Sequence, residues 1–404
     1  MAARTEGRAA PGGAATGAVS APKGAWWNDA NVRAVLYQIL TVLVILGIGW
    51  YLVSNTLANL AQRNIATGFG FLDREAGMPI GEHLISYTPA SSYGRAYLVG
   101  MLNTIFVSAI GIVLATILGT IVGVARLSSN WLIAKLASVY VEVIRNIPLL
   151  LQLFVWYGVL LALPPARQSL SPLPGIFLSQ RGLYFPVLYE HPVHAVMLIL
   201  LVLGVVLTVV VHRWGKRRQA LTGKPFPMLG PALGLIFGLP LIAWAIAGAP
   251  FDPNVPAMKG FNFQGGASVT PEFVALLLGL VTYTAAFIAE TVRAGILAVP
   301  RGQWEAARAV GMSETRILRL IVLPQALRVI VPPTTSQYLN LTKNSSLAVG
   351  IAYPDLVSVG YTMINQTGQA VEGIAMIMAV YLTLSLLIAA FMNWYNKRIA
   401  LKER

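Results

Sequence analysis

The chain has 404 residues, of which 56% are hydrophobic and 11% are charged, against roughly 25% charged residues in a typical soluble domain. A water-soluble surface cannot be built from this composition, and the absence of cysteine excludes a disulfide scaffold and thiolate metal sites. The net charge of +14 does not indicate nucleic acid, because no basic stretch is interleaved with aromatic residues. The sequence therefore predicts an all-α polytopic membrane protein, with the lipid bilayer as its partner and no nucleic-acid binding.

Eight segments are long and apolar enough to cross a hydrocarbon core of about 30 Å, which takes about 20 helical residues. An N-terminal tail, residues 1–34, precedes them and is expected to be disordered. The first apolar run is too long for a signal-peptide core, so we expect it to be retained as an anchor. The predicted spans cover residues 35–60, 97–125, 139–163, 193–211, 228–249, 271–297, 334–352 and 373–394.

The distribution of Lys and Arg predicts the orientation, because cytoplasmic loops of membrane proteins are enriched in these residues. With the N-terminus in the cytoplasm, 21 of the 29 Lys and Arg residues fall in cytoplasmic segments and 6 on the opposite side. Arg145 and Lys343 lie inside spans. The imbalance predicts that both termini are cytoplasmic, and this requires an even number of spans.

The third span carries polar residues in helical register, and Pro148 is expected to bend it. Glu142 and Arg145 are three residues apart, so they can form an ion pair that packs helices, or they can contribute a ligand site. A charge inside the membrane costs roughly 2.5–3.5 kcal/mol on the insertion scale, so this face is expected to point into the bundle. The face consists of Glu142, Arg145, Asn146 and Gln152.

The sixth span has a comparable stripe of small and polar residues, which is also expected to face the bundle interior. Glu290 and Arg293 are again three residues apart, and the same two interpretations, a packing ion pair or a ligand site, stay open. The stripe consists of Thr282, Ala286, Glu290 and Arg293.

The seventh span is too polar over residues 334–346 to face lipid, where each unsatisfied polar group costs several kcal/mol. Pro332 and Pro333 are expected to break the preceding helix, which places Lys343 near the middle of the span. The alternative is that Lys343 lies near an interface and extends to water.

Neither a metal site nor a catalytic site is predicted. His191 and His194 have a spacing compatible with metal binding, but no third ligand is nearby. The sequence has no phosphate-binding loop, nucleophile elbow or zinc-protease motif. Any ATP hydrolysis must therefore belong to another chain.

The segment after the sixth span predicts a short helix over 303–309, a turn at Gly311 and a second helix over 315–323, lying together across the cytoplasmic face. Gly311 can adopt the left-handed conformation that ends a helix, and Ser313 can cap the next one. The segment is either a solvated loop or a contact surface for a partner. The charged residues it would present are Arg301, Glu305, Arg308, Glu314, Arg316 and Arg319.

The motif in this segment is Glu305-Ala-Ala307, three residues, Gly311, nine residues and Ile321-Val-Leu-Pro324. It resembles the cytoplasmic signature of ATP-binding-cassette importer permeases, in which the loop docks into the ATPase subunit. Other stretches are similar to the permeases for polar amino acids, of the histidine, glutamine, arginine and glutamate type. They are Arg145–Gln152, Ala289–Ile296, Gly302–Ala307, Leu323–Ala326 and Leu341–Leu347.

The resemblance implies a five-helix type I importer permease core, to which this chain adds an N-terminal span and a two-span insertion. That layout resembles the larger general L-amino-acid permease subunits. The expected parts are the tail (1–34), an extra span with a periplasmic segment (35–95), the first part of the core (96–163), an inserted periplasmic loop and two-span hairpin (164–250), and the second part of the core (251–404) with the coupling loop (301–324).

The function that the resemblance implies is that of a permease subunit in the bacterial inner membrane, which imports L-amino acids at the expense of ATP. The implied partners are two copies of an ATPase, which would hold ATP and Mg, a second permease subunit and a periplasmic binding protein. No cofactor is expected on this chain. The ATPase-coupling residues would be Gln303, Glu305, Ala306, Ala307, Arg308, Gly311 and Pro324.

The expected substrate path consists of Arg145, Glu290, Asn340 and Lys343, which can pair with the charges of a zwitterion. The family's usual acid after the lysine is replaced by Asn344, so no role is assigned to that acid. An ion-coupled secondary transporter is the alternative function, although no inverted repeat is visible. A non-transporting scaffold or receptor is disfavoured by the polar seventh span.

Overall fold

A computed structural model describes residues 30–62, 67–189, 191–224 and 226–399. It contains two units, residues 1–67 and 68–404, which are described separately. The first unit contains the helix α1, Ala30–Gln62, whose apolar side chains are exposed and fit a lipid environment. The predicted tail lies outside the described residues as far as residue 29, and residues 30–34 already belong to α1.

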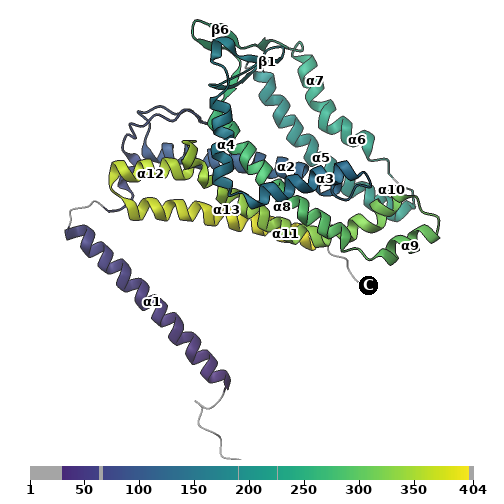
Figure 1. The fold of residues 1–404 in the computed structure, drawn as a ribbon, viewed down its shortest axis with the longest axis horizontal. Coiled ribbons are helices and arrows are strands. Elements are labelled where there is room, and N and C mark those ends of the chain that lie inside the picture. Colours follow the sequence, from purple (N-terminus) through teal and green to yellow (C-terminus); the bar gives the residue numbers. More distant parts are fainter. Residues whose placement is uncertain (1–29, 63–66, 190, 225, 400–404) are drawn as a thin grey trace, which may run out of the picture. The chain divides into compact units, whose positions relative to one another are not determined.

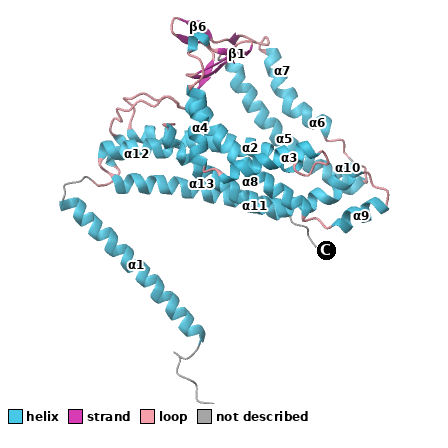
Figure 2. Cartoon of the chain, viewed as in Figure 1, coloured by secondary structure: helices cyan, strands magenta, loops and turns pink. Residues whose placement is uncertain are grey.

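The second unit is mostly helical (Figure 1; Figure 2). Among the described residues of the whole chain, seven helical segments are long and apolar enough to cross a membrane, or eight if the bent pair α3 and α4 counts as one span. This confirms the predicted polytopic helical protein. The helices are α2 Tyr93–Ala125, α3 Trp131–Asn146, α4 Leu149–Leu161, α5 Pro192–Thr222, α6 Leu229–Leu233, α7 Leu239–Ile246, α8 Pro271–Leu297, α9 Arg301–Ala309, α10 Glu314–Ile317, α11 Leu323–Asn344, α12 Leu356–Thr367 and α13 Ala370–Ile399, with short 3₁₀ or π segments η2 Gly70–Asp73, η3 Ala166–Gln168, η4 Gly234–Gly238, η5 Leu318–Val322 and η6 Ser345–Ile351.

Short strands, which the sequence did not indicate, lie in the two connections that flank the α5–α7 hairpin (Figure 2). One antiparallel sheet has the order β1-β2-β3-β8, and the pairs β4-β5 and β6-β7 accompany it. Gly182 begins β3 with φ +116°, and a Cβ there would lie 2.1 Å from the carbonyl oxygen of Val269 in β8. The strands are β1 Leu170–Leu173, β2 Ile176–Ser179, β3 Gly182–Phe185, β4 Val187–Leu188, β5 Pro253–Asn254, β6 Ala257–Lys259, β7 Asn262–Gln264 and β8 Ala267–Val269.

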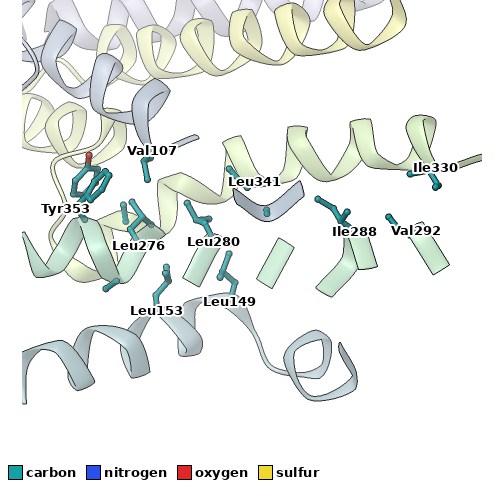
Figure 3. Close-up of a cluster of buried hydrophobic side chains, with 14 of the residues drawn as sticks. Val107, Leu149, Leu153, Leu276, Leu280, Ile288, Val292, Ile330, Leu341 and Tyr353 are labelled. Atoms are coloured by element: carbon teal, nitrogen blue, oxygen red, sulfur yellow. The ribbon is translucent and has the colours of Figure 1, made fainter. Parts of the chain in front are cut away.

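Helix α8 lies at the centre of the second unit. Its start is well specified, because the Thr270 hydroxyl accepts a hydrogen bond from the Phe273 amide (3.2 Å) and Pro271 is the first helical residue. Apolar residues of α4, α8 and α11 form the main core around it (Figure 3). The labelled members include Leu149, Leu153, Leu276, Leu280, Ile288 and Leu341.

Small residues bring α2 close to α8. Gly111, Ala115, Gly119 and Gly123 recur every four residues on α2 and are all buried, and of the glycines Gly119 and Gly123 lie against α8 while Gly111 lies against Leu341 of α11. A Cβ at Gly123 would lie 2.7 Å from the carbonyl oxygen of Ala289, so only glycine permits this approach. The close contact places the C-terminal end of α2, with Arg126, beside the second half of α8.

The third predicted span is interrupted. Helix α3 ends at Asn146, α4 begins at Leu149, and the two helices meet at 108°. Pro148 precedes α4, and the buried Gln152 side chain donates to the carbonyl oxygens of Ile144 and Ile147, both at 2.9 Å. The predicted bend is therefore confirmed as a complete break, and the amide of Gln152 satisfies carbonyl groups that the break leaves free.

The predicted break before the seventh span is wrong. Pro332 and Pro333 lie inside α11, and the helical run continues from Glu314 to Ile351. A proline in a helix costs about 3 kcal/mol, but burial of α11 side chains on both sides of the pair offsets this cost. Lys343 consequently lies in the last turn of α11, and the helical run continues beyond it through η6 to Ile351.

Candidate functional site

Helix α9 and its connection to α10 form the segment that carries the Glu-Ala-Ala motif. Helix α9 ends at Ala309, and Gly311, the residue after its C-cap Val310, has φ +75°. The Gly311 amide donates to the Arg308 carbonyl (2.9 Å) and the Met312 amide to the Ala307 carbonyl (3.2 Å), the bonding pattern of a Schellman motif. The predicted helix end at Gly311 is confirmed, and its geometry depends on a residue that tolerates positive φ.

One face of α9 is anchored and the other is free in this chain. Ala307 is buried in the main core, with Trp304 and Met312 packed against the same cluster. The Arg308 guanidinium forms an ion pair with Glu314 at 2.7 Å, which ties α9 to the start of α10. The exposed coupling candidates are Gln303, Glu305, Ala306, Arg308, Gly311 and Pro324.

The predicted helix after Gly311 is present, but the prediction that it is separate from the following span is wrong. Helix α10 continues through η5 into α11 without a break, so the segment after Gly311 is the start of a span. Ile317 and Val322 are buried in the main core, and this packing holds the segment in line with α11. Ser313 occupies the cap position, but its side chain makes no capping hydrogen bond.

Glu290 lies at the centre of an ion cluster formed by three helices. Arg126 from α2 makes its shortest contact, Arg293 pairs at 2.8 Å, and Arg145 from α3 lies at 3.9 Å. The predicted Glu290–Arg293 pair is thus confirmed. The predicted Glu142–Arg145 pair is not observed: Glu142 is exposed, and Arg145 lies over the Phe287 ring at 5.0 Å from its centroid. Three arginines share one carboxylate, which leaves an excess of two positive charges.

A cavity of about 280 Å³, the cationic cavity, opens at this cluster. Arg145 and Glu290 bring charged groups to its wall, and Gln337 adds an amide from α11. Asn340 and Lys343 are not part of the wall; they are exposed on α11, one and two turns beyond Gln337. The wall is formed by Arg145, Phe287, Glu290, Thr291, Ala294, Val329, Pro333 and Gln337.

A second cavity, of about 440 Å³, lies near the opposite end of α8 and carries acidic groups. The Glu82 carboxylate accepts a hydrogen bond from the Thr270 amide (2.7 Å), and the Glu272 carboxylate accepts one from the Tyr157 hydroxyl (2.8 Å). Burial raises the pKa of Glu82, although the hydrogen bonds from Thr270 oppose this. The two ends of α8 therefore border cavities of opposite charge.

Arg126 is the member of the ion cluster that no short-range spacing in the sequence indicates, because its partner Glu290 lies 164 residues away. Its side chain is 10% exposed, and Nε also contacts the Ser138 hydroxyl at 3.4 Å. The four-residue repeat of small residues on α2 was the signal for the close helix contact that brings Arg126 to Glu290.

His191 has a structural role. Its ring Nδ1 accepts a hydrogen bond from the Val193 amide (3.2 Å) and caps α5. Within the described ranges, no group of three or more His, Cys, Asp or Glu side chains could hold a metal ion.

Residues 221–401 match the family model described as binding-protein-dependent transport system inner membrane component. The chain is 51% identical over 378 residues to the general L-amino acid transport system permease protein AapQ of Rhizobium johnstonii, covering 93% of this chain and 94% of that protein. It is 52% identical over 376 residues to the putative amino-acid ABC transporter permease protein YhdX of Escherichia coli, covering 93% and 96%. Among solved structures, the chain is similar to the crystal structure of an amino acid ABC transporter with histidines. The match covers 76% of this chain and 95% of the matched chain, with 20% sequence identity and a TM-score of 0.45.

Proposed function

The chain belongs to the binding-protein-dependent transport system inner membrane components, and from that premise we propose how this permease subunit of an ATP-driven amino-acid importer works. It is a multi-pass protein of the inner membrane. Membership of this family implies an ATPase partner and a binding protein that delivers the substrate. The alternative of an ion-coupled secondary transporter has no support among the relatives.

The assembly we propose contains two ATPase copies, which hold ATP and Mg, and a second permease subunit that pairs with this one. This chain itself hydrolyses no ATP and binds no cofactor, in keeping with a sequence that has no phosphate-binding loop. Residues 164–250 would be an insertion into a five-helix core, and the α5–α7 hairpin falls within them.

We propose that both termini and α9 face the cytoplasm, as the Lys and Arg distribution predicts. Because the chain has no cysteine, single cysteines can report the orientation. Arg217→Cys at the end of α5 should react with a membrane-impermeant maleimide only from the cytoplasmic side, and Lys259→Cys in β6 only from the periplasmic side. Equal labelling of both from one side would contradict the proposed orientation.

Coupling to the ATPase would run through the exposed face of α9. The anchored side, Ala307 with Trp304 and Met312, connects α9 to the core that also contains α8 and α11. A push or pull on Glu305 and its exposed neighbours is thereby transmitted to the two helices that border the cationic cavity. Closure of the ATPase subunits would therefore rearrange the substrate path.

The cationic cavity is the observation that supports the substrate path. An amino-acid carboxylate needs a cation or amide donors, and the cavity offers Arg145 and Gln337 with an excess of positive charge. Glu290 is already shared by three arginines, so the carboxylate end of the substrate would be recognised here. Lys343 and Asn340 would receive the substrate earlier, because they lie farther along α11 toward its C-terminal end.

Arg145→Ala tests this path in the importer purified through a tag on this chain, with its co-purifying subunits identified and reconstituted in liposomes. Uptake should fall about tenfold or more, because a hydrogen bond to a charged group contributes roughly 1.5–3 kcal/mol. Assembly should persist, since the two arginines closest to Glu290 remain. The control is Lys135→Ala, which removes a cation from the exposed part of the same helix. Unchanged uptake by Arg145→Ala would place the substrate elsewhere.

A further inference from the structure

A second basic cavity, of about 480 Å³, lies away from the cationic cavity of the proposed path. Its wall comes from α5 and from the C-terminal end of α13, with Met228 from the connection before α6. Figure 1 shows the end of α13 at the end of the helical unit where α9 and α10 lie. The lining residues are Thr208, Val209, His212, Arg213, Lys216, Met228 and Arg398.

Apart from Arg398, which belongs to α13, the cations of this cavity share one face of α5. Thr208, His212 and Lys216 follow one another at intervals of four residues, and Arg213 follows Val209 by the same interval. The preceding part of α5 exposes apolar side chains such as Leu198, Ile199 and Val202. The helix therefore changes from a lipid-compatible surface to a cationic one at this cavity, as a helix does at a membrane interface.

No carboxylate neutralises the cations. The sequence has no Asp or Glu over residues 191–251 or 373–402, the stretches that contain the whole lining. Within the described part of the chain, Arg213, Lys216 and Arg398 form no ion pair. The Thr208 hydroxyl is buried and has no hydrogen-bond partner among the described residues. The cavity thus presents cations and a free hydroxyl without an anion to match them.

Aromatic residues frame the cavity as they do at a bilayer surface. The Arg398 guanidinium lies 4.1 Å from the centroid of the Trp394 ring, which fixes the side chain and leaves its edge donors available. Trp214 stands exposed on α5, one residue after Arg213. Tryptophan is enriched at the level of lipid headgroups, so both helices carry an interfacial anchor here.

We propose that this cavity binds the phosphate of an anionic phospholipid headgroup. Arg213, Lys216 and Arg398 would donate hydrogen bonds to the phosphate oxygens, with His212 beside them. Val209 and Met228 supply the apolar part of the wall, against which the glycerol and upper acyl chain would pack. The lipid would join the inserted α5–α7 hairpin to the C-terminal helix of the core, a site that is independent of the substrate path.

The test compares two triple variants of the intact importer after removal of lipid and titration with phosphatidylglycerol, followed by native mass spectrometry. The cavity variant combines Arg213→Ala, Lys216→Ala and Arg398→Ala. The control combines Arg217→Ala, Lys224→Ala and Lys397→Ala, which removes the same charge from neighbouring exposed positions outside the cavity. The cavity variant should bind phosphatidylglycerol about a hundredfold more weakly than the wild-type importer, since each lost cation weakens binding about fivefold. The affinity of the control variant for this lipid should change by less than about fivefold.

Two further binding measurements identify the ligand. Phosphatidylcholine, which carries no net charge, should bind the wild-type importer far more weakly than phosphatidylglycerol, and inorganic phosphate should not displace the lipid. Equal loss in both triple variants, or equal binding of the two lipids, would overturn the proposal. Binding of inorganic phosphate without lipid binding would overturn it as well, because the site would then serve a soluble anion. If the cavity triple variant fails to assemble, the single variant Lys216→Ala is compared instead with the single variant Arg217→Ala.

Discussion

Replacement of Gly311 by valine is expected to reduce transport at least tenfold while the subunit stays in the membrane at its normal level. Gly311 has φ +75°, a conformation that costs a residue with a Cβ about 1–2 kcal/mol and a β-branched residue more. No atom lies within 4 Å of a Cβ built there, so the β-carbon itself has room and the expected strain lies in the backbone conformation. Loss of the Schellman motif would misdirect α9, and uptake and binding-protein-stimulated ATP hydrolysis should fall together by tenfold or more.

Two matched variants isolate the backbone effect. Gly302 lies in α9, has open space around it and does not have positive φ, so Gly302→Ala should leave hydrolysis and uptake near wild type. Gly311→Asn should retain more activity than the valine variant, because asparagine tolerates the left-handed conformation. Full stimulated hydrolysis by reconstituted Gly311→Val would show that α9 is an ordinary connection.

Glu290→Gln is expected to destabilise the subunit itself. The amide cannot neutralise Arg126, Arg145 and Arg293, and the Arg126 side chain is only 10% exposed. Removal of one partner from a buried ion pair costs about 3–5 kcal/mol, and we expect the lower end because the Glu290 side chain is 28% exposed. Such a loss is a large part of a typical stability of about 5–15 kcal/mol. The amount of folded subunit in the membrane and the thermal midpoint of the purified complex should both fall.

Glu142→Gln provides the control, since it removes an exposed carboxylate without a partner in the described ranges and should change neither measurement. The comparison also separates the cluster from the substrate path. Arg145→Ala should impair uptake without loss of the subunit, whereas Glu290→Gln should reduce the subunit before transport can be measured. A Glu290→Gln complex as stable as wild type would mean that solvent or lipid neutralises the arginines.

The sequence by itself determined the features that depend on short stretches of chain. Runs of about 20 apolar residues indicated the spans, since the bilayer requires that length wherever the helix packs. The helix end at Gly311 also followed from local chemistry, because positive φ favours glycine regardless of the rest of the fold. The pairing of Glu290 with Arg293 followed from a spacing of three residues on one helix.

Tertiary structure decided the features that depend on contacts between distant segments. Arg126 and Glu290 are 164 residues apart, and they meet because glycines on α2 permit close packing against α8. The same kind of contact keeps Pro332 and Pro333 inside α11, where burial outweighs the local preference to break the helix. Packing between helices also decides the partner of Arg145. Glu142, the nearest acid in sequence, lies exposed on α3, whereas Glu290 and the Phe287 ring of α8 contact Arg145. Local propensity fixes which helices form, and the packing of their surfaces fixes which charges meet.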